Sequence, residues 1–195
     1  MGKRRGERPF APTTAICPNN IEQMHYDPEI HHRRSIRLKE YDYSKAGAYF
    51  VTICTWDKKC ILGEIDGEKM KLDVYGKIVF EEWHRSSEIR KEIGMDAFVI
   101  MPNHIHGIVI IHDTTIERMK PKSISSFIAG FKSAVTKRIN QIRNTPGFPV
   151  WQRNYYEHVI RNEKELNAIR EYIAYNPLRW NEDTENPNRK PKDKK

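Results

Sequence analysis

Two histidines separated by one residue are the first feature of this sequence that could bind a metal ion. His104 and His106 lie in the run Met-Pro-Asn-His-Ile-His-Gly. On a β-strand, residues i and i+2 point to the same side, so both imidazoles project together and Ile105 points the opposite way. Two neutral imidazoles side by side make a divalent metal site that lacks its third ligand. With eight histidines in 195 residues, chance gives roughly 0.3 such pairs, so the pair needs support from other residues.

A tyrosine near the C-terminus could supply a nucleophile. Apolar spacing predicts a helix over 163–176. Its buried face carries Leu166, Ile169 and Ile173. Tyr172 and Asn176, four residues apart, then share one flank of that face, so the phenol can reach a neighbouring strand. Asn176 could add an amide oxygen to the metal. A tyrosine at a core boundary with its hydroxyl in water is the alternative interpretation of Tyr172.

Three other tyrosines are less suited to this role. Tyr175 falls on the far side of the helix, towards solvent. Tyr155 and Tyr156 are adjacent in a predicted strand, where they point to opposite faces. At most one of these two could therefore face the histidines.

The histidine pair and the tyrosine suit one chemistry, the transfer of a phosphodiester to a phenol. A phenol with a pKa near 10 is a poor nucleophile at neutral pH, and a phosphodiester repels anionic attackers. A metal ion held by His104 and His106 would polarise the phosphate and offset the developing charge. Attack by Tyr172 would leave a phosphotyrosine link that conserves the bond for rejoining.

The positive charge of the chain is concentrated in one segment. The net charge is +8, and between Arg118 and Tyr156 there are basic residues but no Asp or Glu. The eight basic residues are Arg118, Lys120, Lys122, Lys132, Lys137, Arg138, Arg143 and Arg153. Such a field favours a polyanion partner, nucleic acid first, although a basic surface kept for solubility is the alternative.

Six of the residues in and near this segment are candidates for DNA contacts. Lys132, Lys137, Arg138 and Arg143 share the polar side of a helix predicted over 123–143, where they could follow phosphates. Trp151 and Arg153 could stack on or contact exposed bases. Charged helix faces are often only solvated, so this assignment depends on the fold.

The predicted elements that position these residues alternate regularly. They are a strand over 48–56, a hairpin over 61–72, a helix over 75–92, strands over 97–101 and 104–111, a helix over 123–143, a strand over 151–160 and a helix over 163–176. This order predicts an α+β, ferredoxin-like sandwich: a mainly antiparallel sheet with helices on one face, plus the C-terminal tyrosine-bearing helix. We expect the histidines to look out from the other, open face.

Around this domain we expect two polar ends. Residues 1–39 predict a partly disordered N-terminal arm, 40–180 the catalytic domain and 181–195 a charged C-terminal tail. The three cysteines form no C-x-x-C pair, which argues against a disulfide framework or a cysteine zinc site. Without an apolar run of about 20 residues, we expect a cytoplasmic protein with no membrane partner.

Three blocks of sequence in this order resemble the REP-associated tyrosine transposases, which belong to the single-tyrosine HUH superfamily. They are Met-Pro-Asn-His104-Ile-His106-Gly, then Trp151-Gln-Arg-Asn-Tyr-Tyr-Glu-His-Val-Ile-Arg-Asn, then Tyr172-Ile-Ala-Tyr-Asn176-Pro-Leu-Arg. The resemblance covers roughly residues 33–180. It implies that His104 and His106 are the metal pair, that Asn176 is the third ligand and that Tyr172 is the nucleophile.

The resemblance also implies the reaction and its partners. Tyr172 would cleave single-stranded hairpin DNA from repeated palindromic elements, giving a 5′-phosphotyrosine intermediate and a free 3′-OH, and then rejoin the strand. Mg²⁺ or Mn²⁺ would be the cofactor, and the protein would be a monomer or a homodimer. Two alternatives stay open: a domesticated hairpin-binding protein that does not cleave, and a metal-dependent hydrolase of small phosphates.

Overall fold

The structure, a computed structural model, describes residues 45–113 and 123–189. Its elements follow in the order predicted from the sequence. They are β1 (Gly47–Cys54), the 3-10 helix η1 (Trp56–Lys58), β2 (Gly63–Asp66), β3 (Lys69–Leu72), α1 (Val74–Ile89), β4 (Ile93–Met101), β5 (His104–Ile111), α2 (Ile124–Ile142), β6 (Tyr156–Ile160), α3 (Glu163–Ala174) and the 3-10 helix η2 (Pro177–Glu182).

A four-stranded sheet forms the centre of this part of the chain. Its strand order is β4-β5-β1-β6, and β2 and β3 make a separate hairpin. All three neighbouring pairs in the large sheet are antiparallel. β5 and β1 are therefore the central strands, and β4 and β6 are the edge strands. This is the α+β, ferredoxin-like arrangement that the sequence predicts.

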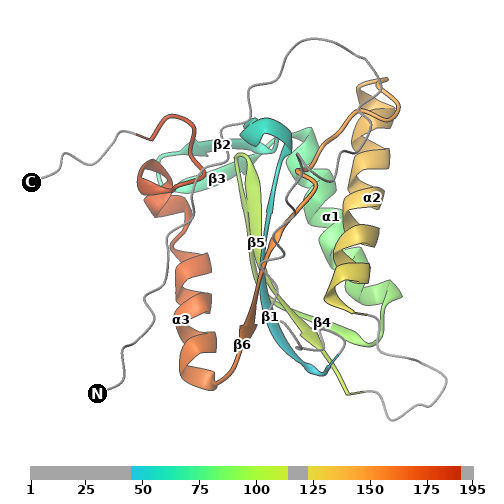
Figure 1. Ribbon diagram of the computed structural model, residues 1–195. Helices are drawn as coiled ribbons and strands as arrows, with labels where there is room; N and C mark the ends of the chain where they lie inside the picture. The colour runs from blue at the N-terminus through green and yellow to red at the C-terminus, as the bar shows by residue number, and fades with distance from the viewer. Residues whose placement is uncertain (1–44, 114–122, 190–195) are drawn as a thin grey trace, which may run out of the picture. The chain divides into compact units, whose positions relative to one another are not determined.

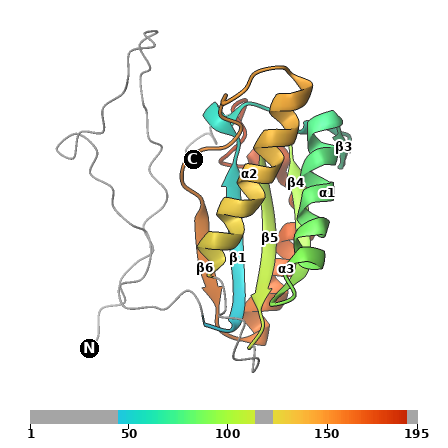
Figure 2. The ribbon, with the colours of Figure 1, turned by 90° about the vertical axis from the view of Figure 1, so that its right-hand side faces the viewer.

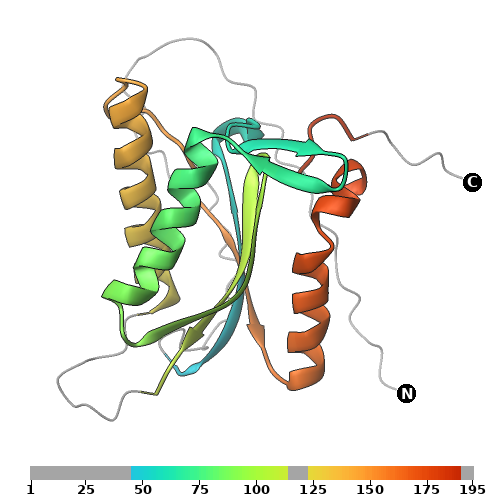
Figure 3. The same cartoon turned by 180° about the vertical axis from the view of Figure 1, so that it is seen from behind.

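The sheet separates two apolar layers. On one side α1 and α2 cover the sheet, and α3 lies on the other side (Figures 1 and 3). The alternation along β5 sends Ile105 and Val109 into the core with α1 and α2, whereas Ile108 packs with Ile173 of α3. Figure 2 shows α1 and α2 side by side across the sheet. Period-two side-chain geometry thus gives each face its own helix partner.

The helix on the second face changes one expectation. The face that carries His104 and His106 was predicted to be open, but α3 and the residues after η2 cover it. Both imidazoles are buried, with 0% and 4% of their surface exposed. Alternation along the strand showed which way the side chains point but gave no information about what packs on them.

Two strands differ in length from their predictions. The strand predicted over 151–160 is regular only over Tyr156–Ile160, and Trp151 makes an isolated bridge to Thr55. The strand predicted over 97–101 begins earlier, at Ile93, because a bulge between Met95 and Phe98 lets the pairing with β5 continue. A bulge interrupts the alternation of apolar residues, so it hides a strand from pattern analysis.

Several predictions concern residues outside the described ranges. The N-terminal arm over 1–39 and the basic residues Arg118, Lys120 and Lys122 lie there. Within the described ranges, each helix is too short or too polar to span a lipid bilayer.

Candidate active site

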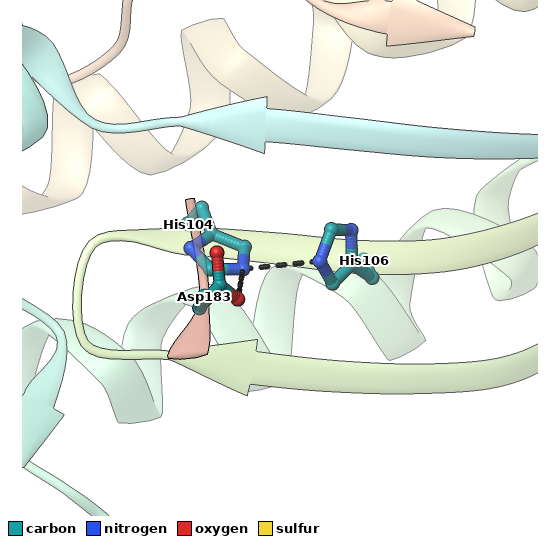
Figure 4. Close-up of side chains that lie close together, drawn as sticks. All are labelled: His104, His106 and Asp183. Atoms are coloured by element: carbon teal, nitrogen blue, oxygen red, sulfur yellow. Dashed lines mark hydrogen bonds and ion pairs between the residues drawn. The ribbon is translucent and has the colours of Figure 1, made fainter. Parts of the chain in front are cut away.

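The histidine pair lies at the start of β5, directly after the tight turn that joins it to β4. The two Nε2 atoms are 3.1 Å apart. The chain places them by strand geometry alone, since His104 and His106 are alternate residues of one strand. Figure 4 shows both rings on the same side of the strand, with Asp183 in front of His104.

The Nδ1 atom of each imidazole lies within hydrogen-bond distance of a side-chain oxygen. His104 Nδ1 lies 2.9 Å from Asn103 Oδ1, and His106 Nδ1 lies 2.8 Å from Thr52 Oγ1. Thr52 is the residue opposite His106 in the β1–β5 pairing. With protons on both Nδ1 atoms, the two Nε2 lone pairs face the same point. Partners of this kind orient the histidine ligands of a metal ion.

Both rings are neutral at physiological pH. Burial is the first cause that lowers the pKa of His104, and the neighbouring His106 and Lys58 add to it. Burial also lowers the pKa of His106 to about 3. A metal ligand must be unprotonated, so these rings need lose no proton before a cation binds.

Asp183 completes a group of three possible metal ligands. Its Oδ2 lies 3.7 Å from His104 Nε2, and one ligand atom from each of His104, His106 and Asp183 lies within 4.8 Å of the others. The backbone N–H of Glu185 donates to Asp183 Oδ1 at 2.7 Å. Burial raises the pKa of Asp183, followed by the negative charge of Glu185. A cation at this point would offset the cost of the buried carboxylate.

No local sequence pattern indicated Asp183 as a ligand. It falls in the segment that was assigned to a charged tail, far along the chain from the histidines. In the structure, contacts with the turn before β5 hold that segment: Asn103 Nδ2 donates to the carbonyl oxygens of Lys58 and Glu185 at 3.0 and 2.6 Å. Lys58 Nζ also lies 3.1 Å from Glu185 Oε2. These are long-range contacts, which no local pattern indicates.

Tyr172 reaches the pair from α3. Its hydroxyl lies 3.3 Å from His106 Nε2, and its ring packs edge-on against Phe50 with centroids 6.1 Å apart. The residue is 41% exposed, so the nucleophile candidate lies at a boundary between the core and solvent, as predicted. Burial and then the charge of Asp183 raise the pKa of Tyr172. The phenol is therefore protonated at neutral pH, and it needs a nearby cation or base to react.

Asn176 lies two residues after the end of α3 and is 3% exposed. Its side-chain carbonyl oxygen is buried without a hydrogen-bond partner among the described residues. A buried oxygen of this kind costs free energy unless something binds it. The group of two neutral imidazoles and a carboxylate at His104, His106 and Asp183 fits a divalent cation.

The rival tyrosines lie on opposite faces, as strand geometry requires. Tyr155 packs against the core beneath α1 and α2, and its hydroxyl donates to Glu157 Oε2 at 2.9 Å. Tyr156 packs on the α3 side, where its ring lies edge-on to Phe50. Tyr175 is 47% exposed. Tyr172 has a hydrogen-bond contact to His106 of the pair.

Most of the basic residues that were predicted to contact DNA from α2 bind other residues of the chain instead. Arg138 pairs with Glu81 and Glu82 of α1 at 2.6 and 2.9 Å. Arg143 donates to the carbonyl oxygens of Phe148 and Pro149, at 3.1 and 3.3 Å. These contacts were not predicted, because the acceptors come from separate segments.

Lys132 is also held by the chain. Its ammonium donates to the carbonyl oxygens of Gln152 and Asn154 at 2.8 and 3.1 Å. The Trp151 ring is 6% exposed and packs in the core. The remaining two predicted contacts, Lys137 and Arg153, line a cavity of about 790 Å³ between the C-terminal half of α2 and residues 146–153.

Comparison with known proteins gives matches to one family. Residues 71–176 match the model of the family described as transposase IS200-like. A protein of Haemophilus influenzae with no assigned function is 41% identical, over 81% of this chain and 95% of its own length. A second protein of that organism, named as a REP-associated tyrosine transposase, is 26% identical over 71% of this chain and 74% of its own.

A solved structure shares the fold. It is that of a REP-associated tyrosine transposase bound to a REP hairpin, with a TM-score of 0.52, 19% identity and 74% of each chain covered. At this identity the likeness supports the architecture of sheet and helices. The chemistry has to be argued from the residues themselves.

Proposed function

Because the chain belongs to the family of IS200-like transposases, we propose that it cleaves and rejoins single-stranded hairpin DNA with Tyr172 as the nucleophile. The observation that carries the proposal is the position of the Tyr172 hydroxyl, 3.3 Å from His106 Nε2. His106 forms, with His104 and Asp183, a group that could hold a metal ion. A protein that only binds hairpins needs neither the tyrosine nor the buried imidazoles.

The residues divide the work as follows. His104, His106 and Asp183, with Asn176, would hold a Mg²⁺ or Mn²⁺ ion. That ion, when bound, would polarise the scissile phosphate and stabilise its developing charge. Thr52 Oγ1 and Asn103 Oδ1 can each accept a hydrogen bond from an Nδ1–H group, and in that tautomer both Nε2 atoms stay available. The phenol stays protonated until the reaction, because its pKa is raised.

In the reaction, the Tyr172 oxygen attacks phosphorus and loses its proton. The bond from phosphorus to the 3′ oxygen breaks, and that oxygen takes up a proton to give a free 3′-OH. The phosphate stays on the 5′ side as a phosphotyrosine ester. Attack of a 3′-OH on this ester reverses the step and rejoins DNA, so no external energy source is needed.

The choice of substrate rests on the relatives. One solved structure of the shared fold is bound to a REP hairpin, and the net charge of +8 suits an anionic partner. We therefore propose hairpin-forming repeated palindromic DNA as the substrate. Lys137 and Arg153, which line the cavity beside α2, are the cations that we assign to phosphate contacts.

A covalent-adduct assay tests this proposal. The protein is incubated with end-labelled hairpin DNA and Mn²⁺ or Mg²⁺ and then run on a denaturing gel. We expect an adduct with the wild type, and none with Tyr172→Phe, with His106→Ala or in EDTA. Tyr175→Phe is the matched control, since it removes an exposed hydroxyl from the same helix turn and should leave the adduct unchanged.

Two results would contradict the proposal in different ways. An adduct that persists in Tyr172→Phe would mean that another residue is the nucleophile, and Tyr156 would be tested next. Tight hairpin binding without an adduct, with either metal ion, would favour a protein that binds hairpins and does not cut them.

A further inference from the structure

The tyrosine helix is tied to both edges of the sheet. On β4, the Arg170 guanidinium donates to Asp96 through Nε at 2.9 Å and Nη2 at 2.7 Å, a two-bond contact with one carboxylate. On β6, His158 Nε2 lies 2.7 Å from Glu165 Oε1. Because β4 and β6 are the outer strands of the sheet, α3 is held from two opposite directions.

The β4 bulge gives Asp96 its place in this contact. Met95 and Phe98 both pack on the core beneath α1 and α2, although they are three residues apart. The extra residue in the bulge leaves Ala97 on the α3 side, where it packs with Ile173 and its neighbours. The backbone N–H of Ala97 donates to Asp96 Oδ1 at 2.6 Å, which fixes the carboxylate that faces Arg170. Bulges commonly redirect a side chain in this way.

Apolar packing alone leaves the rotation of α3 weakly determined. Ile173 is the one residue of the helix that is fully buried. Leu166 and Ile169 are partly buried. At about 100° per residue, Arg170 and Glu165 lie on opposite flanks of this narrow stripe. Two tethers on opposite flanks resist rolling of the helix about its own axis, which a single apolar stripe does not.

The rotation matters for the position of the phenol. A helix has a radius of about 5–6 Å with its side chains, so a roll of about 20° moves a side-chain tip by roughly 2 Å. The Tyr172 hydroxyl would then leave its position 3.3 Å from His106. A misplacement of about 1 Å can cost around a hundredfold in rate when reacting groups must be aligned.

We propose that Arg170 and Asp96 are positioning residues that set the rotation of α3 and so aim Tyr172 at the histidine pair. The part of this inference that concerns Tyr172 rests on the proposed function. The contact between Arg170 and Asp96, which we call the clamp, does not. Arg170 has no contact with the histidines among the described residues; it acts on the site through the helix.

Hydrogen exchange and adduct formation together test the clamp. The variants are Asp96→Asn, which keeps an acceptor for the Ala97 N–H, Arg170→Gln, and the double variant. Lys164→Gln is the matched control, since it removes one exposed cation from the same helix. We expect amides of 166–174 to exchange about three- to tenfold faster in both single variants, as the loss of a partly exposed two-bond ion pair allows. Amides of β1 and β5 and the control should be unchanged.

The double variant and the kinetics separate positioning from a general loss of stability. Arg170 also donates to Asn167 Oδ1 at 2.9 Å and to Glu163 Oε1 at 3.5 Å. We therefore expect the double variant to exchange no faster than Arg170→Gln, because Asp96→Asn then removes no contact that Arg170→Gln has left in place. Adduct formation at saturating DNA should slow by about tenfold while the hairpin Kd stays at the wild-type value. Arg170→Lys should recover part of the rate.

The outcomes are distinct. Unchanged exchange in both single variants, or faster exchange with a wild-type rate of adduct formation, would overturn the positioning role. If the wild type forms no adduct with any hairpin, it is the proposed function that fails; the clamp is then judged by exchange and by the double variant alone.

Discussion

The histidine pair depends on residues that are near and far in the sequence. Strand geometry puts the rings of His104 and His106 together, Asn103 and Thr52 orient them, and Asp183 adds a third possible metal ligand. The Asp183 carboxylate is buried with a raised pKa, so without a cation its ionised form is costly. The three possible metal ligands thus come from two separate segments, the start of β5 and the residues after η2.

Asp183→Asn tests the new ligand at the residue scale. The change keeps the shape of the side chain and removes its charge, so we expect Mn²⁺ affinity to fall by about ten- to a hundredfold. Titration calorimetry of the purified protein measures this without any DNA. Glu68→Gln, which removes a carboxylate from the exposed β2–β3 turn, should bind Mn²⁺ like the wild type; equal affinity in Asp183→Asn would exclude Asp183 from the metal site.

At the scale of elements, α2 shows that a basic helix face need not be a binding face. Arg138 joins α2 to α1, Arg143 holds 148–149, and Lys132 holds the carbonyl oxygens of 152–154. The segment after α2 has little regular structure before β6 begins. These side-chain donors replace the hydrogen bonds that a longer strand would have supplied.

Lys132→Met should therefore destabilise the fold by about 1–3 kcal/mol, the cost of leaving carbonyl oxygens without a donor. Lys137→Met, on the same helix, should cost less than about 0.5 kcal/mol. Urea unfolding followed by circular dichroism measures both. Equal stability of the two variants would mean that the Lys132 contacts contribute nothing to folding.

The same lysine predicts a dependence on pH. Burial lowers the pKa of Lys132 from 10.5 to about 8 in the folded protein. Between pH 8 and 10.5 the unfolded chain binds more protons at this residue, so its contribution to stability rises with pH across that window and is constant below it. The wild type should gain stability relative to Lys132→Met from pH 8 to 10, measured by the same urea experiment.

At the scale of the whole molecule, Lys137 and Arg153 line the cavity beside the C-terminal half of α2, while α3, which carries Tyr172, lies on the other face of the sheet. A hairpin that contacts both must pass an edge of the sheet. Phosphate contacts of this kind add affinity without sequence preference, and salt weakens them.

The salt dependence of hairpin binding tests the phosphate contacts that we assign to Lys137 and Arg153. Lys137→Gln and Arg153→Gln should each reduce the slope of log K against log salt by about one, and should weaken binding to any hairpin alike. Lys69→Gln, an exposed cation of the β2–β3 hairpin, is the control. An unchanged slope in both variants would place the DNA on another surface.

Local periodicity was enough to predict much of this protein. Alternation over 104–111 put both imidazoles on one side of a strand, and helical spacing over 163–176 put Tyr172 beside the buried stripe. The order of elements predicted the ferredoxin-like sheet. These features depend on repeats of two and of about 3.6 residues, which a sequence displays directly.

Tertiary structure alone decided what meets across the fold. The pairing of β1 with β5 set Thr52 against His106, the contacts of Asn103 brought Asp183 to the histidines, and a bulge turned Asp96 towards Arg170. Each of these joins residues far apart in the chain, where no periodic pattern relates one to the other. The sequence by itself determined which side chains face the site, and the packing of α3 and the segment after η2 determined which of them touch.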